Sequence, residues 1–234
     1  MSLPRFTEDS LAFLRELKDH NDREWFRSHR PQYETHIRRP MVETIEQLAI
    51  DLRGFAPELV ATPKRSMYRI YRDTRFSTDK SPFKNQVAAM FPHRALTKHG
   101  GAGLYFHIAH DHVMIGGGIY APEPSHLYQL RKHISANLKQ FQGIIESPDF
   151  HRLFGEMNGR QLKRVPKGFL AEDPASEYLK FCQFLAGTRR PSSFATRPRF
   201  YTSLKRLFEQ LAPFIRFLNQ AAETRQNRHL TRLS

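Results

Sequence analysis

The amino-acid sequence predicts an α+β fold: a single domain with a central, mainly antiparallel sheet flanked by N-terminal and C-terminal helices. Apolar residues recur at helical spacing near both ends of the chain, and residues 104–109 alternate between apolar and polar. The expected strands between them are joined by short loops, which favours an antiparallel sheet over strand–helix–strand crossovers. The domain is expected to span residues 1–222, followed by a frayed, polar and basic tail at 223–234.

The first quarter of the chain is expected to be helical. Thr7 is a suitable N-cap for a helix that ends near residues 20–21, and Asp22 is a suitable cap for a second, short helix. A longer helix follows, broken or kinked at Pro40 and ending near Gly54. The apolar residues at helical spacing, which we expect in the core, are Leu11, Leu14, Leu17, Ile37, Met41, Ile45, Leu48 and Leu52.

Residues 65–84 read RSMYRIYRDTRFSTDKSPFK and hold six Lys or Arg residues but only two Asp. The first half alternates as a strand does, with Tyr68 and Ile70 on one face and Arg69 on the other. The second half is rich in Asp, Ser, Thr and Pro, which favour turns. We therefore expect a strand that runs into a polar turn, where fixed positive charges can be presented to a ligand.

Further strands are expected directly after this block. Residues 86–91 are typical of a buried strand, and residues 104–109 and 113–119 are typical of an antiparallel hairpin that turns at His110 and Asp111. Glycines 116–118 predict a bulge or a close approach of two backbones. Residues 96–103 are expected to form a Gly-rich loop.

The second half of the chain is expected to be mostly helical. A long amphipathic helix is predicted from Ser125 to about Ile145. The next helix is expected to begin at Ser147 and Pro148, because Pro suits the first helical position, and to end at Gly159.

The C-terminal part is expected to contain one more strand. A short helix after Asp173 leads to a predicted strand at residues 181–186, and residues 189–199 are expected to form an irregular basic linker. A last helix follows, bent or restarted at Pro213.

Composition limits the class of protein. The formal net charge of +14 favours polyanion binding, but residues 187–234 alone hold ten Lys or Arg and two acids, which a basic tail explains. A single cysteine, Cys182, excludes an intramolecular disulfide framework and is expected to be a small buried hydrophobe. No apolar run is long enough to span a membrane, and the N-terminus lacks a secretory pattern. We therefore expect a cytoplasmic protein without a membrane partner.

Two motifs carry a resemblance to a known family. The first is Asn-x-Arg-x-Trp-Phe at residues 21–26, and the second is Arg-Asp-x-Arg-Phe-x-x-Asp-Lys-x-Pro-Phe-Lys at residues 72–84. Further matches are the Gly-Gly-Gly strand with Pro122 and Pro124, Arg131, and the loop LKRVPKGF at residues 162–169. With these motifs the chain resembles, over nearly its whole length, the family known as domain of unknown function 2461. The resemblance implies no activity, substrate or catalytic residue.

The charged block is the best candidate site. The forked guanidinium of Arg and the compact ammonium group of Lys suit the binding of phosphate or carboxylate, while Asp residues can orient the guanidinium planes. The expected ligand-binding residues are Arg69, Arg72, Asp73, Arg75, Asp79, Lys80, Lys84, Arg131, Lys163 and Lys167. The alternative is an ion-pair network that pins the turn to the sheet. In both cases we expect Arg72 and Arg75 to be partly buried and paired with Asp73, Asp79 or an anion, so that Asp79→Ala destabilises the fold.

No metal and no cofactor is expected. Asp73 and Asp79 could hold Mg²⁺, but six neighbouring cations make them a poor cation site. The histidines do not match a familiar zinc signature in their spacing. The set comprises His93, His99, His107, His110 and His112.

The leading expectation for function is recognition of a small anionic ligand at the charged block of residues 69–84. A nucleic-acid-binding protein is the second hypothesis, and exposed aromatic residues beside the cations would favour it through base stacking. A phosphoryl-transfer or hydrolytic enzyme is the third. The oligomeric state is left open.

Overall fold

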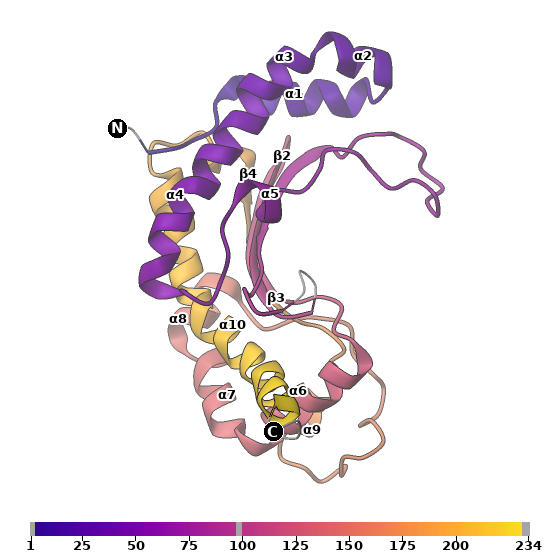
Figure 1. Ribbon diagram of the computed structural model, residues 1–234, viewed down its shortest axis with the longest axis vertical. Helices are drawn as coiled ribbons and strands as arrows, with labels where there is room; N and C mark the ends of the chain where they lie inside the picture. Colours follow the sequence, from indigo (N-terminus) through magenta and orange to yellow (C-terminus); the bar gives the residue numbers. More distant parts are fainter. Residues whose placement is uncertain (1–2, 97–99, 231–234) are drawn as a thin grey trace. The chain divides into compact units, whose positions relative to one another are not determined.

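The computed structural model describes residues 3–96 and 100–230, and it describes side chains as far as residue 222. It confirms the α+β class, with a four-stranded antiparallel sheet in the order β1-β2-β3-β4 (Figure 1). The strands are β1 Gln86–Phe91, β2 Gly103–Ala109, β3 His112–Ile119 and β4 Phe184–Pro191. The three segments predicted around residues 86–119 are therefore confirmed as strands.

The described chain groups into two compact units. The first contains the described residues up to Phe91 together with Tyr105–Ile115 and Arg189–Arg206. The second contains Gly116–Thr188, the described residues of 92–104, and the described residues from Leu207 onward. Strands β2, β3 and β4 contribute residues to both units. The predicted domain bounds, residues 1–222 and 223–234, remain a prediction.

Helices of the N-terminal quarter form much of the first unit. They are α1 Glu8–Asp19, α2 Arg23–Ser28, α3 Arg30–Gln32, the π-helical turn η1 Tyr33–Arg38, α4 Arg39–Phe55 and α5 Pro63–Ser66. Asp22 caps α2 as predicted, because its side chain accepts hydrogen bonds from the backbone N–H groups of Glu24 and Trp25. The irregularity expected at Pro40 is the π-helical turn that ends directly before α4, where Pro40 occupies the first turn. The periodic apolar residues are all buried.

The strand expected after residue 66 is not regular. Met67 and Tyr71 make isolated antiparallel bridges with Ala89 and Phe83, and no continuous ladder joins them. Residues 67–85, called the arm below, leave α5, turn, and return into β1 (Figure 1). The alternation of side chains correctly indicated an extended backbone, but the polar turn residues and Pro82 interrupt the pairing that a strand requires.

In the second unit, the long helix predicted from Ser125 to Ile145 is two helices. Asn137 has a non-helical backbone (φ −127°, ψ 35°) and separates α6 Pro124–Ala136 from α7 Leu138–Ile145. The next helix, α8 Pro148–Phe154, begins as predicted but ends at Gly155, where φ is +69°, and not at Gly159. The break at Asn137 lets Phe141 of α7 pack against Phe217, with ring centroids 5.1 Å apart.

The remaining elements differ from prediction mainly in their bounds. The short helix is α9 Ser176–Leu179, and the last strand begins at Phe184 and runs on to Pro191, so the expected basic linker begins inside β4. A 3₁₀ turn, η2 Ser192–Phe194, precedes α10 Phe200–Leu230, which contains Pro213 and extends beyond residue 222. Residues 97–99 of the predicted loop and 231–234 of the predicted tail lie outside the described residues. No described helix is long and apolar enough to cross a membrane.

The three glycines of β3 permit the close approach that the sequence predicted. A Cβ atom on Gly116 would lie 2.6 Å from the carbonyl oxygen of Ala186, and one on Gly118 would lie 1.9 Å from that of Phe184. Gly118 also has φ +131°, which side-chain-bearing residues rarely adopt. The glycines therefore allow the backbone of β4 to lie directly against β3.

Candidate functional site

The arm is attached to the N-terminal helices by Asn21. Its side-chain amide donates to the carbonyl oxygen of Phe83 and accepts from the Phe83 N–H, both at 3.0 Å, and it donates to Asn85 Oδ1 at 2.7 Å. The Phe83 ring is buried and stacks on Phe26 of α2 with centroids 4.2 Å apart. The two motifs recognised in the sequence thus contact each other, and Asn21, Phe26 and Phe83 position the arm.

Both acids of the arm are engaged by arginines. Arg72 donates to Asp79 and, at 2.7 Å, to the hydroxyl of Ser81, while Arg75 donates twice to Asp73 at 3.0 and 2.7 Å. The hydrogen bond and charge of Arg75 lower the pKa of Asp73 to about 2. The predicted pairing is confirmed, whereas the predicted burial holds only for Arg72, whose side chain is 26% exposed against 77% for Arg75.

Ser81 adds to the binding of Asp79. Its hydroxyl and its backbone N–H both donate to Asp79 Oδ1, at 2.7 and 2.9 Å. These bonds, followed by those from Arg72, hold the pKa of Asp79 well below its usual range. The Asp79 carboxylate therefore fixes the plane of the Arg72 guanidinium on one side and is itself fixed by Ser81.

Three other cations of the arm have no carboxylate partner within the described residues. Lys80 donates to the carbonyl oxygen of Thr74 at 2.9 Å, and Lys84 donates to that of Arg69 at 2.7 Å. Lys84 also lies over the Tyr68 ring, 5.4 Å from its centroid, and burial lowers the pKa of Lys84. Arg69 is exposed and makes no ion pair with any described residue. Carbonyl groups therefore orient Lys80 and Lys84 without neutralising them.

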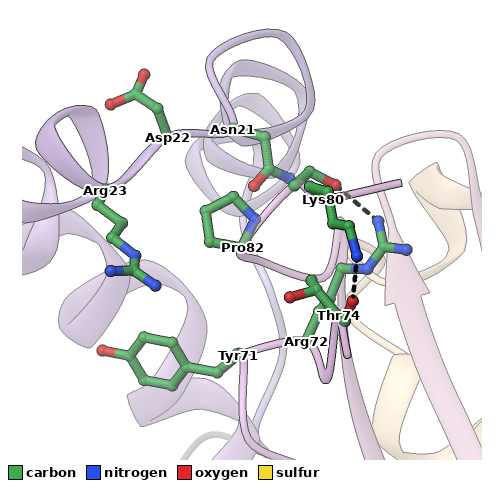
Figure 2. A pocket seen from close by; sticks show the side chains of 9 residues that line it. Asn21, Asp22, Arg23, Tyr71, Arg72, Thr74, Lys80 and Pro82 are labelled. Atoms are coloured by element: carbon green, nitrogen blue, oxygen red, sulfur yellow. Dashed lines mark hydrogen bonds between the residues drawn. The ribbon is translucent and has the colours of Figure 1, made fainter. Parts of the chain in front are cut away.

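A pocket of about 750 Å³ lies between the start of α2 and the arm. Figure 2 shows Arg23 pointing toward the side of Tyr71, and Lys80 and Arg72 grouped around Thr74. The dashed lines mark the bonds of Arg72 to Ser81 and of Lys80 to Thr74. The residues lining the pocket are Asn21, Asp22, Arg23, Tyr71, Arg72, Thr74, Lys80, Ser81 and Pro82.

The charge of this pocket is positive. Its one acid, Asp22, accepts hydrogen bonds from the first backbone N–H groups of α2. Arg23 is exposed and makes no hydrogen bond or ion pair with any residue that the structure describes. Lys80 lacks a carboxylate, and the Arg72 guanidinium is preorganised by Asp79. The pocket can therefore offer a planar Arg donor and two further cations to one anion.

A second pocket, of about 380 Å³, shares Tyr71 with the first. It is lined by four cations and one acid, together with the rings of Phe26, Tyr33 and Tyr68. The acid, Glu34, is 3.4 Å from Arg38. Burial, followed by the charge of Glu34, raises the pKa of Tyr33 to about 12. The four cations are Arg30, Arg38, Lys64 and Arg69.

Three predicted site residues belong to the second unit. Arg131 is 7% exposed and donates to the carbonyl oxygen of Phe181 at 2.9 Å, and its Nε has no partner among the described residues. Lys163 and Lys167 are exposed on the loop between α8 and α9. Their participation in one site with the arm remains a prediction.

Among the described residues, no group of three or more His, Cys, Asp or Glu could hold a metal ion. Asp73 and Asp79 each bind an arginine, and Cys182 is buried as predicted. Of the histidines, His99 lies outside the described residues and His93 is buried, while His107 and His112 contact each other.

Sequence reasoning placed the arm correctly but missed Arg23 as a member of the site. The sequence alone identifies Arg23 only as part of the Asn-x-Arg-x-Trp-Phe motif, although its position directly after the N-cap of α2 is an available signal. The helix cap points the first residue of α2 toward the arm, which Asn21 holds in place.

A family model described as "Conserved hypothetical protein (DUF2461)" matches residues 9–217, a range that includes both motifs. It is the family that the sequence was found to resemble. No curated protein matches the chain.

Proposed function

The chain belongs to the DUF2461 family, and we propose that it binds a small anionic ligand, bearing phosphate or carboxylate, in the pocket between α2 and the arm. One observation carries the proposal: Arg23, Arg72 and Lys80 line the same pocket, and Arg23 and Lys80 have no carboxylate partner in the described part of the chain. An ion-pair network that served only to hold the arm would not leave these charges uncompensated at a concave surface.

The chemistry of the pocket suits an oxyanion. Arg72 presents a guanidinium whose plane is held by Asp79 and Ser81, so little side-chain freedom is lost on binding. Lys80 donates one hydrogen bond to the Thr74 carbonyl oxygen, and its ammonium group has further N–H donors for a ligand. The single cysteine is consistent with a reducing compartment, and we place this binding activity in the cytoplasm.

Calorimetric titration with inorganic phosphate and with citrate tests the proposal. Arg23→Gln and Lys80→Gln are each expected to weaken binding by about tenfold, since hydrogen bonds to charged groups contribute roughly 1.5–3 kcal/mol. Arg75→Gln is the matched control, because Arg75 is exposed, is paired with Asp73 and does not line the pocket. Equal affinities for wild type, Arg23→Gln and Lys80→Gln would exclude this pocket as the binding site.

A single-stranded nucleic acid is the second candidate ligand, and Phe76 is the observation that favours it. The Phe76 side chain is 96% exposed in the arm, and the Arg75 guanidinium lies 5.8 Å from its ring centroid. An exposed ring beside a cation is a suitable platform for a stacked base.

Labelled oligonucleotides titrated over a range of salt concentrations test this second candidate. Phe76→Ala is expected to weaken binding by about tenfold if a base stacks on the ring. Use of all six Lys and Arg residues of residues 65–84 on duplex DNA would give a log–log salt slope of about −5, whereas one small anion releases far fewer counterions. A variant with Arg225, Arg228 and Arg232 replaced by Gln is the control for the basic C-terminus. Binding lost only in that variant would assign it to the C-terminus.

A further inference from the structure

A chain of hydrogen bonds joins four side chains of β2, β3 and the turn between them. The Tyr105 hydroxyl lies 2.9 Å from His107 Nδ1, and His107 Nε2 lies 2.9 Å from His112 Nε2. His112 Nδ1 lies 2.7 Å from Asp111 Oδ1, whose other oxygen accepts from Arg189 of β4 at 3.0 Å. Tyr105 and His107 are two residues apart on β2 and therefore share the less buried face of the sheet. We call Tyr105, His107, His112 and Asp111 the relay.

The protons of the relay can be assigned from its ends. Asp111 is a carboxylate acceptor, so His112 Nδ1 carries the proton and donates it. With His112 neutral, its Nε2 is an acceptor, and His107 Nε2–H must donate to it. His107 Nδ1 is then an acceptor, and the Tyr105 O–H donates to it. Every donor points in one direction, from Tyr105 toward Asp111.

We propose that the relay is an acid–base site, in which uptake of one proton moves the positive charge to His112 and reverses each hydrogen bond between His112 and Tyr105. Protonated His112 donates from Nε2, so His107 Nε2 becomes the acceptor because two N–H groups cannot face each other at 2.9 Å. His107 then carries its proton on Nδ1 and donates to the Tyr105 oxygen. The site is separate from the anion pocket and does not depend on it.

The same state, with His112 protonated and the hydrogen bonds reversed, is reached when a ligand donates an acidic proton to Tyr105. The ligand proton passes to the Tyr105 oxygen, and the original Tyr105 proton passes to His107 Nδ1. The His107 Nε2 proton passes to His112 Nε2, which leaves an imidazolium beside the Asp111 carboxylate and a ligand with one negative charge more. Protons and charge balance without a further reactant.

Groups from several elements face the relay. The His110 ring lies 3.6 Å from Asp111 and 3.4 Å from Lys18, and the Tyr68 ring packs edge-on against Tyr105 at 6.3 Å. The neighbours that titrate or carry a charge are Lys18 of α1, Tyr68 of the arm, His110 of the turn and Arg189 of β4. Gln86 of β1 also forms a hydrogen bond with the Tyr105 side chain.

The two ends of the relay differ in their surroundings. Burial, followed by the charges of His112 and Arg189, lowers the pKa of His107 to about 4. Burial raises the pKa of Tyr105 to about 12, so Tyr105 passes protons on as a neutral hydroxyl. Of the two histidines in the relay, His112 is the one with a carboxylate against its ring. Within the described residues, Asp111 and its arginine thus define the end of the relay at which an added proton is stabilised.

Ring nitrogen NMR of the full chain, labelled with ¹⁵N-histidine and titrated with acid, tests the proposal. At high pH we expect protons on His107 Nε2 and on His112 Nδ1. As pH falls, His112 should become doubly protonated while the proton of His107 moves from Nε2 to Nδ1 at the same pH. A His107 that keeps its tautomer through this transition, or rings that titrate independently, would overturn the proposal.

Two variants and a metal control sharpen the test. Tyr105→Phe removes the acceptor for His107 Nδ1–H and should lower the pH of proton uptake by about one unit, a tenfold change in proton affinity. Tyr68→Phe removes a neighbouring hydroxyl that is not part of the relay and should leave this pH unchanged. One equivalent of Zn²⁺ should not alter either ring. Stoichiometric Zn²⁺ binding to both rings would show that the two Nε2 atoms form a metal site and would refute the relay.

Discussion

Asn21 binds both backbone groups of Phe83, 62 residues further along the chain, as a neighbouring β-strand would. The contact joins the loop before α2 to the arm and sets one wall of the anion pocket. A side-chain amide carries both a donor and an acceptor, which few other side chains can offer at this length.

Asn21→Ala is expected to destabilise the protein by about 2–3 kcal/mol, because the partly buried polar groups of Phe83 lose their partners. Urea unfolding followed by circular dichroism measures this change. Asn85→Ala is the control, since it loses only the 2.7 Å bond to Asn21 and should cost less than about 1 kcal/mol. Similar losses in the two variants would contradict a special role for the contact with Phe83.

Asp79→Asn is expected to strengthen phosphate binding by about threefold to tenfold, because it frees the charge of Arg72 within the pocket. The destabilisation expected from the sequence should be small, since the Asp79 side chain is 58% exposed, and the thermal midpoint should move by no more than ~2 °C. Asp73→Asn frees Arg75, which does not line the pocket, and should leave phosphate affinity unchanged. Calorimetric titration of both variants with phosphate measures these two affinities.

Stability is expected to fall between about pH 6.5 and pH 4 because of His107. Its pKa is lowered in the folded chain from 6.5 to about 4, so the unfolded chain takes up this proton first as pH decreases. The stabilisation that neutral His107 contributes is fully present above its pKa in the unfolded chain and is lost as pH falls through its pKa in the folded chain. It amounts to about 1–2 kcal/mol after allowance for partial exposure.

Unfolding free energies measured across this pH range should depend less on pH in His107→Gln than in wild type. His151→Gln, at an exposed position on α8, should retain the dependence of the wild type. An unaltered pH dependence in His107→Gln would show that other groups cause it.

Gly118→Ala is expected to destabilise the protein by at least about 3 kcal/mol or to prevent folding. The new Cβ would lie 1.9 Å from the Phe184 carbonyl oxygen, at a residue with φ +131°. Gly143→Ala, in α7, is the control: apart from its chain neighbours and the backbone of its own helix, nothing lies within 4 Å of its Cβ position, so a gain of about 0.5–1 kcal/mol is expected. Thermal melts of the two variants should therefore shift in opposite directions.

The sequence by itself determined the features that depend on near neighbours. Helix periodicity and the cap residues Thr7 and Asp22 located α1 and α2, and the alternation of residues 104–109 located β2. The close approach at the β3 glycines and the pairing of Arg72 and Arg75 with acids a few residues away were also predictable. Each of these follows from spacing along one segment.

The tertiary structure decided what depends on register between distant segments. Arg23 and Lys80 line one pocket only because Asn21 bonds to Phe83, and no local pattern specifies that pairing. The contact of His107 with His112 depends on how β2 and β3 pair across the turn, since a shift of one residue would place the two rings on opposite faces. Likewise, the isolated bridges of the arm, Met67 with Ala89 and Tyr71 with Phe83, join residues that lie apart in the sequence, and spacing along one segment does not specify them.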